Sequence, residues 1–289
     1  FARGMRRLAR RPHLAADVHA IDVVGTGGDG SGSLNISTGT ALLVAACGLP
    51  VVKHGNRSIS SRAGSADVLE ALGVPMPLDE DAAPACLAAA SFTFLFAPYY
   101  HPAMKALAPV RTALGVRTIF NILGPLTNPA EPALYVIGAP RLAEAKLIAD
   151  TLAGMPIERA FVIHGAEGWD EPTPMGPFTL FDVHQGRVAV EVRSPADYGL
   201  ETCSRAGLAG GDARYNASAL RAVLSGEDRG PHRDCLLLGA ALALEVAGAT
   251  HSRRAGVEQA AHAIDSGAAR RVLEALAAFS AATPGSPSR

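Results

Sequence analysis

The segment IDVVGTGGDGSGSLNISTGTALLVAACG, Ile21–Gly48, carries groups that could bind a phosphate. Its glycine-rich loop contains five glycines: Gly25, Gly27, Gly28, Gly30 and Gly32. A structural turn needs only one or two glycines, because each adds conformational entropy to the unfolded chain. The excess predicts that backbone N–H groups approach an anion at the start of the apolar helix that follows.

Asn35, Ser37 and Thr38 open that helix and could extend the anion site. If the segment is only structural, one of them serves as a helix cap. The loop is neither a dinucleotide fingerprint with its spacing into a helix nor a P-loop, which ends in Gly-Lys followed by Ser or Thr. Taken alone, it is compatible with either a phosphate site or a tight turn.

A second polar cluster, VVKHGNRSISSRAGSAD, Val51–Asp67, follows directly on an apolar strand pattern. It contains Lys53, His54, Asn56 and Arg57, followed by several serines. Most such runs are solvated loops. In a parallel sheet, however, ligands bind at the carboxyl ends of the strands. Two cations and several hydroxyls at that edge would complement a polyphosphate.

Two further segments add candidates. In Ala97–Ala130, His101 and Arg111 could lie on neighbouring turns of a helix, although alone they fit a helix cap and a surface cation. In VIHGAEGWDEPTPMGP, Asp170 and Glu171 are adjacent, and the proline after Glu171 favours extended backbone there. Both carboxylates could then serve one metal, and hard oxygen ligands indicate Mg²⁺ rather than zinc. The residues alone predict a Mg²⁺-dependent enzyme acting on a phosphorylated small molecule.

Composition limits the class of protein. The 289 residues carry 26 Lys+Arg and 27 Asp+Glu, a net charge of −1, so no global field favours nucleic acid or an anionic membrane. No uncharged apolar run reaches the ~18 residues of a membrane span, and we find no signal peptide. The four cysteines are widely spaced without a C-x-x-C pair, which predicts reduced thiols in a cytoplasmic protein.

Strand-like and helix-like segments alternate, which predicts an α/β fold with a mostly parallel central sheet flanked by helices. The expected strands are Ala20–Val24, Pro50–Lys53, Phe92–Phe96, Ala133–Ile137 and Ala160–Ile163, then a hairpin of Phe178–Val183 and Arg187–Val192. The expected helices are Leu34–Cys47, Ala66–Leu72, Asp79–Ser91, Pro102–Leu114, Leu142–Leu152, Asn216–Leu224, Arg233–Val246 and Val257–Phe279. The glycine-rich loop and KHGNR each follow a strand, so both are expected at the ligand-binding edge of the sheet.

Together these segments closely resemble the anthranilate phosphoribosyltransferase family. The resemblance rests on DVVGTGGDG…LNIST, VVKHGNRSISSRAGSADVLEALGV, HPAMKALAPVRTALGVRTIFNILGPLTNP and GWDEPTPMGP. It continues more weakly through GGDARYNASALRAVLSG, RDCLLLGAALAL and AIDSGAA, and so spans the chain from about Ile21 to Leu276. It implies transfer of the phosphoribosyl group of phosphoribosyl pyrophosphate (PRPP) to the amine of anthranilate. The products are N-(5-phosphoribosyl)anthranilate and pyrophosphate, in tryptophan biosynthesis. It also implies two Mg²⁺ per active site and a homodimer.

The resemblance further implies how the chain is divided and which residues form the site. Residues 1–19 are expected to be the remnant of a smaller helical domain that looks N-terminally truncated here, which could also include part of the segment near 79–114. Residues 20–280 are expected to form the α/β phosphoribosyltransferase domain, and 281–289 a flexible tail. The implied PRPP-binding residues are Gly25, Thr26, Gly27, Gly28, Asp29, Asn35, Ser37, Thr38, Lys53 and Ser65. The implied anthranilate-binding residues are Gly25, His54, Asn56, His101 and Arg111. The implied metal ligands are Ser37, Asp170 and Glu171, and the implied catalytic residues are Lys53, Asp170 and Glu171.

Three alternatives stay open. A pyrimidine-nucleoside phosphorylase would share the general fold, but KHGNR and the Asp-Glu pair argue against it, and phosphorolysis of thymidine or uridine would reveal it. A non-catalytic relative that binds nucleic acid is disfavoured by the near-zero net charge, and a salt-dependent DNA shift assay would test it. A catalytically idle structural subunit is disfavoured because every candidate ligand is present.

Overall fold

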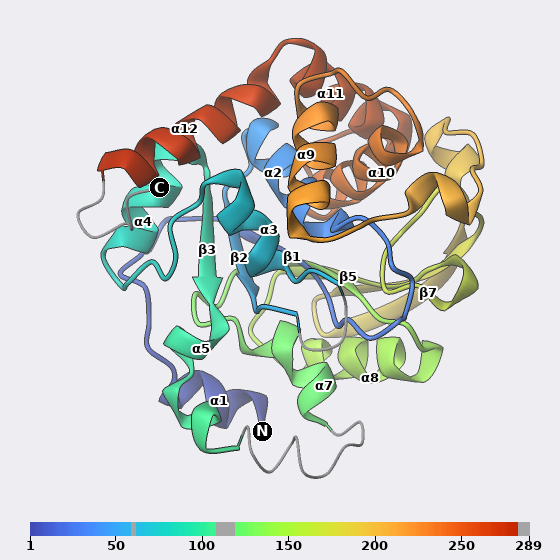
Figure 1. The fold of residues 1–289 in the computed structure, drawn as a ribbon. Coiled ribbons are helices and arrows are strands. Elements are labelled where there is room, and N and C mark those ends of the chain that lie inside the picture. Colours follow the sequence, from blue (N-terminus) through green and yellow to red (C-terminus); the bar gives the residue numbers. More distant parts are fainter. Residues whose placement is uncertain (59–61, 108–118, 283–289) are drawn as a thin grey trace.

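The computed structural model describes residues 1–58, 62–107 and 119–282 (Figure 1). Within these ranges seven strands form one sheet in the order β3-β2-β1-β4-β5-β6-β7. They are β1 (Ile21–Gly25), β2 (Val51–Gly55), β3 (Phe92–Phe96), β4 (Leu134–Gly138), β5 (Arg159–His164), β6 (Phe178–His184) and β7 (Arg187–Arg193). Strands β1 to β5 are parallel, whereas β6 and β7 are antiparallel. The predicted α/β fold with a mostly parallel sheet is confirmed.

The strand order places a topological switch point between β1 and β4. From β1 the chain adds β2 and then β3 on one side, and β4 and then β5 on the other. Ligands of open α/β sheets bind outside the carboxyl ends of the strands at such a point. The two strands end in register there, with Gly25 of β1 opposite Gly138 of β4.

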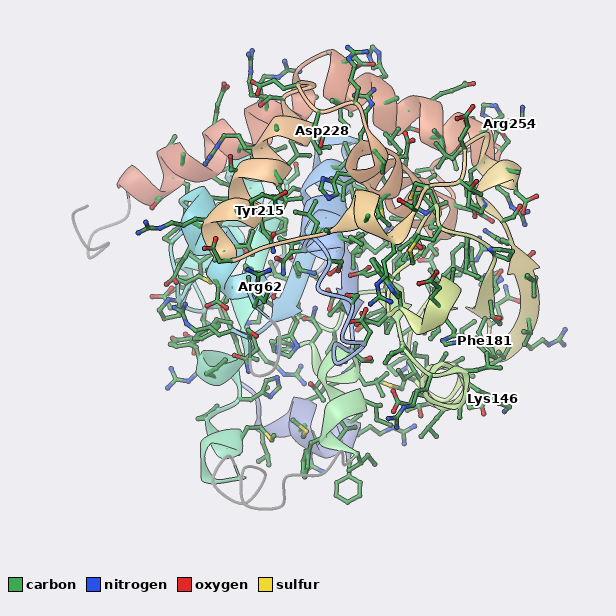
Figure 2. All side chains as sticks on the ribbon, turned by 45° about the vertical axis from the view of Figure 1, so that its right-hand side comes forward. Arg62, Lys146, Phe181, Tyr215, Asp228 and Arg254 are labelled. Carbon is green, nitrogen blue, oxygen red and sulfur yellow. The ribbon has the colours of Figure 1, made fainter. Side chains whose placement is uncertain are left out.

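Helices cover both faces of the sheet. They are α1 (Ala2–Leu8), α2 (Ile36–Ala46), α3 (Ser65–Leu72), α4 (Ala82–Ala90), α5 (Ala97–Tyr100), α7 (Phe120–Leu123), α8 (Leu142–Ala153), α9 (Ala213–Leu224), α10 (Pro231–Val246), α11 (Arg253–Asp265) and α12 (Ala268–Ala282). One face, here the α2 face, is covered by α2 and α9 to α12; the other, the α8 face, is covered by α1, α7 and α8 (Figure 1). Lys146 on α8 and Arg254 on α11 accordingly lie on opposite sides of the sheet (Figure 2).

The apolar core is split between these two faces because successive strand residues point to opposite sides. Ile21 and Val23 of β1 join the larger cluster on the α2 face. Tyr135 and Ile137 of β4 join a second cluster with α8 and with Phe181 of β6. Each fully buried side chain of this size contributes about 1.5–3 kcal/mol relative to an exposed one. The central strands are thereby fixed from both sides, which holds their carboxyl ends in place.

All the expected strands and most of the expected helices are present, with ends within three residues of the expected ones, whereas the short helices α1, α5 and α7 were not among the expected helices. The hairpin of β6 and β7 is confirmed, and its turn residues Gln185 and Gly186 have φ of 51° and 72°, as a two-residue hairpin turn requires. The expectation of a single helix over Val257–Phe279 is wrong. The chain breaks at Gly267, whose φ is 76°, so that α11 and α12 are separate helices. The division into a helical remnant, an α/β domain and a tail stays a prediction.

Two other expectations concern the helix after His101 and the absence of a membrane span. Of the expected helix Pro102–Leu114, residues Pro102–Leu107 form a 3₁₀ helix and the rest lies outside the described residues. In the described parts of the chain, none of the helices combines the length and the apolar character that crossing a membrane requires.

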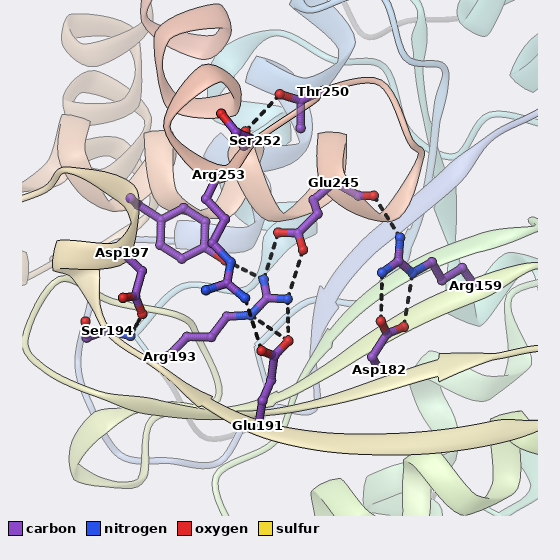
Figure 3. Close-up of polar contacts among 11 residues, drawn as sticks. Arg159, Asp182, Glu191, Arg193, Ser194, Asp197, Glu245, Thr250, Ser252 and Arg253 are labelled. Carbon is purple, nitrogen blue, oxygen red and sulfur yellow. Dashed lines mark hydrogen bonds and ion pairs between the residues drawn. The ribbon is translucent and has the colours of Figure 1, made fainter.

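A buried ion-pair network ties β7 to the helices of the α2 face (Figure 3). Arg193, which is 3% exposed, donates to both carboxylate oxygens of Glu245 at 2.7 and 2.9 Å and to Glu191. It also donates to the Tyr198 hydroxyl at 2.6 Å, while Arg253 donates to the second oxygen of Glu191 at 3.0 Å. Every charge in the network has a partner of opposite sign, so burial of the guanidinium is tolerated.

Candidate active site

The glycine-rich loop leaves the carboxyl end of β1 in a conformation that needs glycine. Gly27, Gly28, Gly30 and Gly32 have φ between 65° and 80°, in the region where other residues are strained. The Thr26 N–H donates to Gly138 O at 2.9 Å and holds the loop against the end of β4. The loop then leads into α2, so its backbone lies beside a helix N-terminus, as the sequence predicts.

The Asp-Glu pair lies directly over the ends of β1 and β4. A Cβ on Gly25 would overlap the Asp170 carboxylate, and a Cβ on Gly138 would overlap the Asp170 backbone carbonyl. Asp170 accepts from the Gly27 N–H, and Glu171 Oε1 accepts from the Ser37 N–H at 3.1 Å. The two glycines therefore make room for the carboxylates at the switch point.

Burial raises the pKa values of both Asp170 and Glu171. Asp170 is 6% exposed, and burial, followed by the charges of Glu171 and Asp29, raises its pKa well above the ordinary value. Burial likewise raises the pKa of Glu171 to about 7, although Lys53 and the Ser37 N–H oppose the shift. Two carboxylates crowded in this way favour a cation between them. Together with the Ser37 hydroxyl they present the hard oxygen donors that Mg²⁺ prefers.

Lys53 supplies a buried cation to the same place. It is 1% exposed, and its Nζ donates to Val23 O at 2.5 Å and to Ser37 Oγ at 3.3 Å. Burial lowers its pKa, while the carboxylates of Asp22, Glu171 and Asp170 oppose the shift. The ammonium thus lies between the end of β1 and the start of α2, where an anion on the glycine-rich loop would meet it.

Two buried residues that sequence reasoning missed support this edge. Asp22 is 0% exposed, and its carboxylate accepts from Asn128 Nδ2 at 2.8 Å and from the His54 N–H at 3.4 Å. Asn128 also donates to Val52 O at 2.7 Å and accepts from the Ala130 N–H at 2.9 Å. Burial raises the pKa of Asp22 to about 6. An aspartate inside the apolar strand IDVV was the available signal.

His54 and His101 meet on the α8 face. His54 follows Lys53 on β2 and therefore points to the opposite side of the sheet. Its ring packs edge-on against the His101 ring, with centroids 5.1 Å apart, and its Nδ1 lies 3.3 Å from Gly124 O. Burial lowers both pKa values, that of His54 to about 3, so both rings are neutral near pH 7. Both Nε2 atoms are buried without a hydrogen-bond partner among the described residues.

Two pairs of predicted residues, Thr26 with Thr38 and Asn56 with Ser65, differ in their contacts. The hydroxyls of Thr26 and Thr38 are buried without a hydrogen-bond partner within the described ranges, so each could bond to a ligand. Ser65 Oγ donates to Asn56 O at 3.2 Å, so these two residues are brought together at the end of β2. Arg111 lies outside the described residues.

Asp29 and Asn35 complete the loop. Asp29 Oδ1 accepts from the Ser31 N–H at 3.0 Å, and its charge reaches Asp170. Asn35 is the N-cap residue of α2 but makes no side-chain capping bond; its Nδ2 instead donates to Ala63 O at 3.1 Å. The loop, Lys53 and the two carboxylates thus converge at the carboxyl ends of β1, β2 and β4.

Comparisons with known proteins give the chain a family. The family model described as "Glycosyl transferase family, a/b domain" matches residues 17–270. Anthranilate phosphoribosyltransferase of Chloroflexus aggregans is 47% identical over 269 residues, which cover 93% of this chain and 79% of the relative. That of Rhodopseudomonas palustris is 48% identical over the same length and coverage.

Solved structures agree. The crystal structure of anthranilate phosphoribosyltransferase from Thermus thermophilus matches with a TM-score of 0.91 and 42% identity, over 97% of this chain and 83% of that one. The Saccharomyces cerevisiae enzyme in complex with PRPP and Mg matches with a TM-score of 0.90 and 29% identity, over 98% and 79%. With the glycine-rich loop, the buried lysine and the carboxylate pair at one sheet edge, the chain belongs to the anthranilate phosphoribosyltransferases of this glycosyl transferase family.

Proposed function

We propose that the carboxyl ends of β1, β2 and β4 are where this chain transfers the phosphoribosyl group of PRPP to the amine of anthranilate. The products are N-(5-phosphoribosyl)anthranilate and pyrophosphate, in the tryptophan-biosynthetic step of the family. The observation that carries the proposal is the convergence of Lys53, the glycine-rich loop and the Asp170–Glu171 pair at the switch point of the sheet.

The α2 face holds the donor substrate. Backbone N–H groups of the glycine-rich loop and the hydroxyls of Thr26 and Thr38 bind phosphate oxygens, since both hydroxyls are buried and open to a new partner. Lys53, held by Val23 O, binds the pyrophosphate and stabilises the charge that develops on it as it leaves. Ser65 adds a hydroxyl from the start of α3.

Mg²⁺ completes the donor site. Ser37, Asp170 and Glu171 would hold it, because their oxygens suit a hard cation and the two buried carboxylates repel each other without one. Bound there, the metal would neutralise pyrophosphate charge. The Saccharomyces cerevisiae relative has been solved with PRPP and Mg. We propose two ions per site and dependence of the reaction on Mg²⁺.

The α8 face supplies the acceptor side. His54 and His101 present neutral, buried rings whose Nε2 atoms have no hydrogen-bond partner among the described residues, which suits an aromatic substrate. Asn56 follows from the same strand end, and Arg111 is assigned the anthranilate carboxylate, for which a guanidinium fork suits better than a lysine. The aromatic amine is neutral near pH 7, so the enzyme chiefly positions it against the anomeric carbon and needs no strong base.

The proposal extends to assembly and location. We assign the chain a homodimer that uses its N-terminal helical part, supported by the exposed Phe1 and Leu8 at the two ends of α1. The four free cysteines support a cytoplasmic location. Light scattering at two protein concentrations tests the dimer.

Loss of anthranilate fluorescence in the presence of PRPP, with and without Mg²⁺, tests the reaction and the metal site together. We expect loss that requires both PRPP and Mg²⁺ and that vanishes in the Asp170→Asn/Glu171→Gln double variant. The control, Asp150→Asn/Glu158→Gln, changes two exposed carboxylates to amides on the outer surface and should react as the unaltered chain does. Reaction without PRPP, or full activity in the first double variant, would overturn the proposal.

A further inference from the structure

Asn216 lies on α9 and reaches the residue that precedes α2, beside the glycine-rich loop. It belongs to α9, in the GGDARYNA segment, and is 2% exposed. Its Nδ2 donates to Asn35 Oδ1 at 2.7 Å across 181 positions of sequence. Asn35 is the residue immediately before α2, so a buried amide on one helix contacts the entrance to another.

The two side-chain amides form a relay between two backbone groups whose roles are fixed. The Gly211 N–H can only donate, and it donates to Asn216 Oδ1 at 2.7 Å. The Asn216 NH₂ must therefore face Asn35 Oδ1. The Asn35 NH₂ then faces Ala63 O, which can only accept, at 3.1 Å. Both amide orientations follow from the backbone groups at the two ends.

The segment that carries Asn216 is also fastened to the glycine-rich loop itself. The Gly210 N–H donates to Gly32 O at 2.8 Å, and the Leu34 N–H donates to Leu208 O at 3.2 Å. A Cβ on Gly210 would overlap Ser33 O, so the two backbones touch. The relay is thus embedded in a rigid contact between residues 208–216 and the loop that is proposed to bind PRPP.

We propose that Asn216 is a positioning residue that fixes the Asn35 amide with its NH₂, and not its carbonyl, toward the PRPP anion. One Asn35 Nδ2 hydrogen is used by Ala63 O, which leaves the second for a phosphate oxygen beside the start of α2. A flipped Asn35 would place its one carbonyl oxygen where Nδ2 now lies, against both that anion and Ala63 O, and would turn its NH₂ toward the Asn216 NH₂. This inference rests on the proposed function, because it assumes that PRPP occupies the glycine-rich loop.

The test measures PRPP binding by calorimetry and steady-state kinetics on the Asn216→Leu variant. Leucine keeps the branched shape of asparagine with methyl groups in place of the amide oxygen and nitrogen, so it cannot orient Asn35. We expect the Kd and KM for PRPP to rise roughly 10- to 100-fold, as for one lost hydrogen bond to a charged ligand, with anthranilate KM changed less than about twofold. If the leucine variant does not fold, Asn216→Ser replaces it with the same expectation.

Asp212→Ala is the matched control. Asp212 caps the same helix by accepting from the Tyr215 N–H at 2.8 Å, and in the described parts of the chain its side chain makes no hydrogen bond to Asn35, so its loss destabilises α9 without freeing the relay. We expect a lower melting temperature with unchanged PRPP Kd. Equal PRPP Kd in the Asn216 variant and the unaltered chain, or an equal rise in both variants, would overturn the inference. Failure of the unaltered chain to bind PRPP would instead overturn the proposed function.

Discussion

Replacement of Gly138 by alanine should uncouple the carboxylate pair from the sheet. The Gly138 Cβ would overlap the backbone carbonyl of Asp170, which must then move by more than ~1 Å to reach ordinary van der Waals separation. A misplacement of about 1 Å in a reacting site costs on the order of 100-fold, which corresponds to about 2.7 kcal/mol of transition-state stabilisation. Overpacking should lower the free energy of unfolding by a further ~1–3 kcal/mol.

The assay is kcat/KM from anthranilate fluorescence, with Mg²⁺ titrated in each variant. For Gly138→Ala we expect a fall of about 100-fold and a higher half-saturating Mg²⁺ concentration. Gly154→Ala is the control, because a Cβ there would meet Thr151 O at an ordinary 3.6 Å and φ is −93°. The reasoning is refuted if Gly138→Ala keeps kcat/KM within about threefold of the unaltered chain.

Three other substitutions probe the acceptor side and the fold. Arg111→Ala should raise the anthranilate KM roughly 10- to 100-fold with a smaller effect on kcat, and an unchanged KM would remove Arg111 from the acceptor site. The pKa of His54 is about 3 in the folded protein, below its ordinary 6.5. Above pH 6.5 the ring is therefore neutral in both states, whereas below pH 6.5 the unfolded state binds a proton that the folded state does not, and the free energy of unfolding declines as the pH falls toward 3. His54→Gln should therefore flatten the fall in urea-unfolding free energy below pH 6.5 by up to ~1.4 kcal/mol per pH unit, and an identical slope would contradict the assignment. Arg193→Met should cost about 3 kcal/mol in urea unfolding, because Glu245 loses its buried partner, yet leave kcat/KM within about twofold; a large loss of activity at unchanged stability would contradict a structural role.

The elements were predictable where one local pattern dominated. The buried strands are short apolar runs, and Gln185-Gly186 between two alternating segments predicted the β6–β7 hairpin. The break at Gly267 was not predictable in the same way, because apolar periodicity continues through it and a single glycine is tolerated within a helix. Only packing of α12 against α2 and α4, which sequence does not display, decides that the chain turns there.

The same distinction between local and distant patterns decides which site residues could be predicted. Residues in contiguous motifs, such as Lys53 and the Asp170–Glu171 pair, were identified from the sequence and lie together at the sheet edge. Asp22, Asn128 and Asn216 were missed because their partners are 106 and 181 positions away, so no local spacing marks them. Their contribution is to hold other side chains in place, which becomes visible only once the backbone has folded.

The alternation of Lys53 and His54 along β2 has a consequence for redesign of the enzyme. One residue serves the α2 face and the next serves the α8 face, so the sheet itself separates the proposed donor chemistry from the proposed acceptor chemistry. Substitutions around His54 and His101 should reshape the proposed acceptor site for other aromatic amines while the layer proposed to bind pyrophosphate stays intact. A one-residue insertion in β2 would exchange the two faces and should abolish both functions at once.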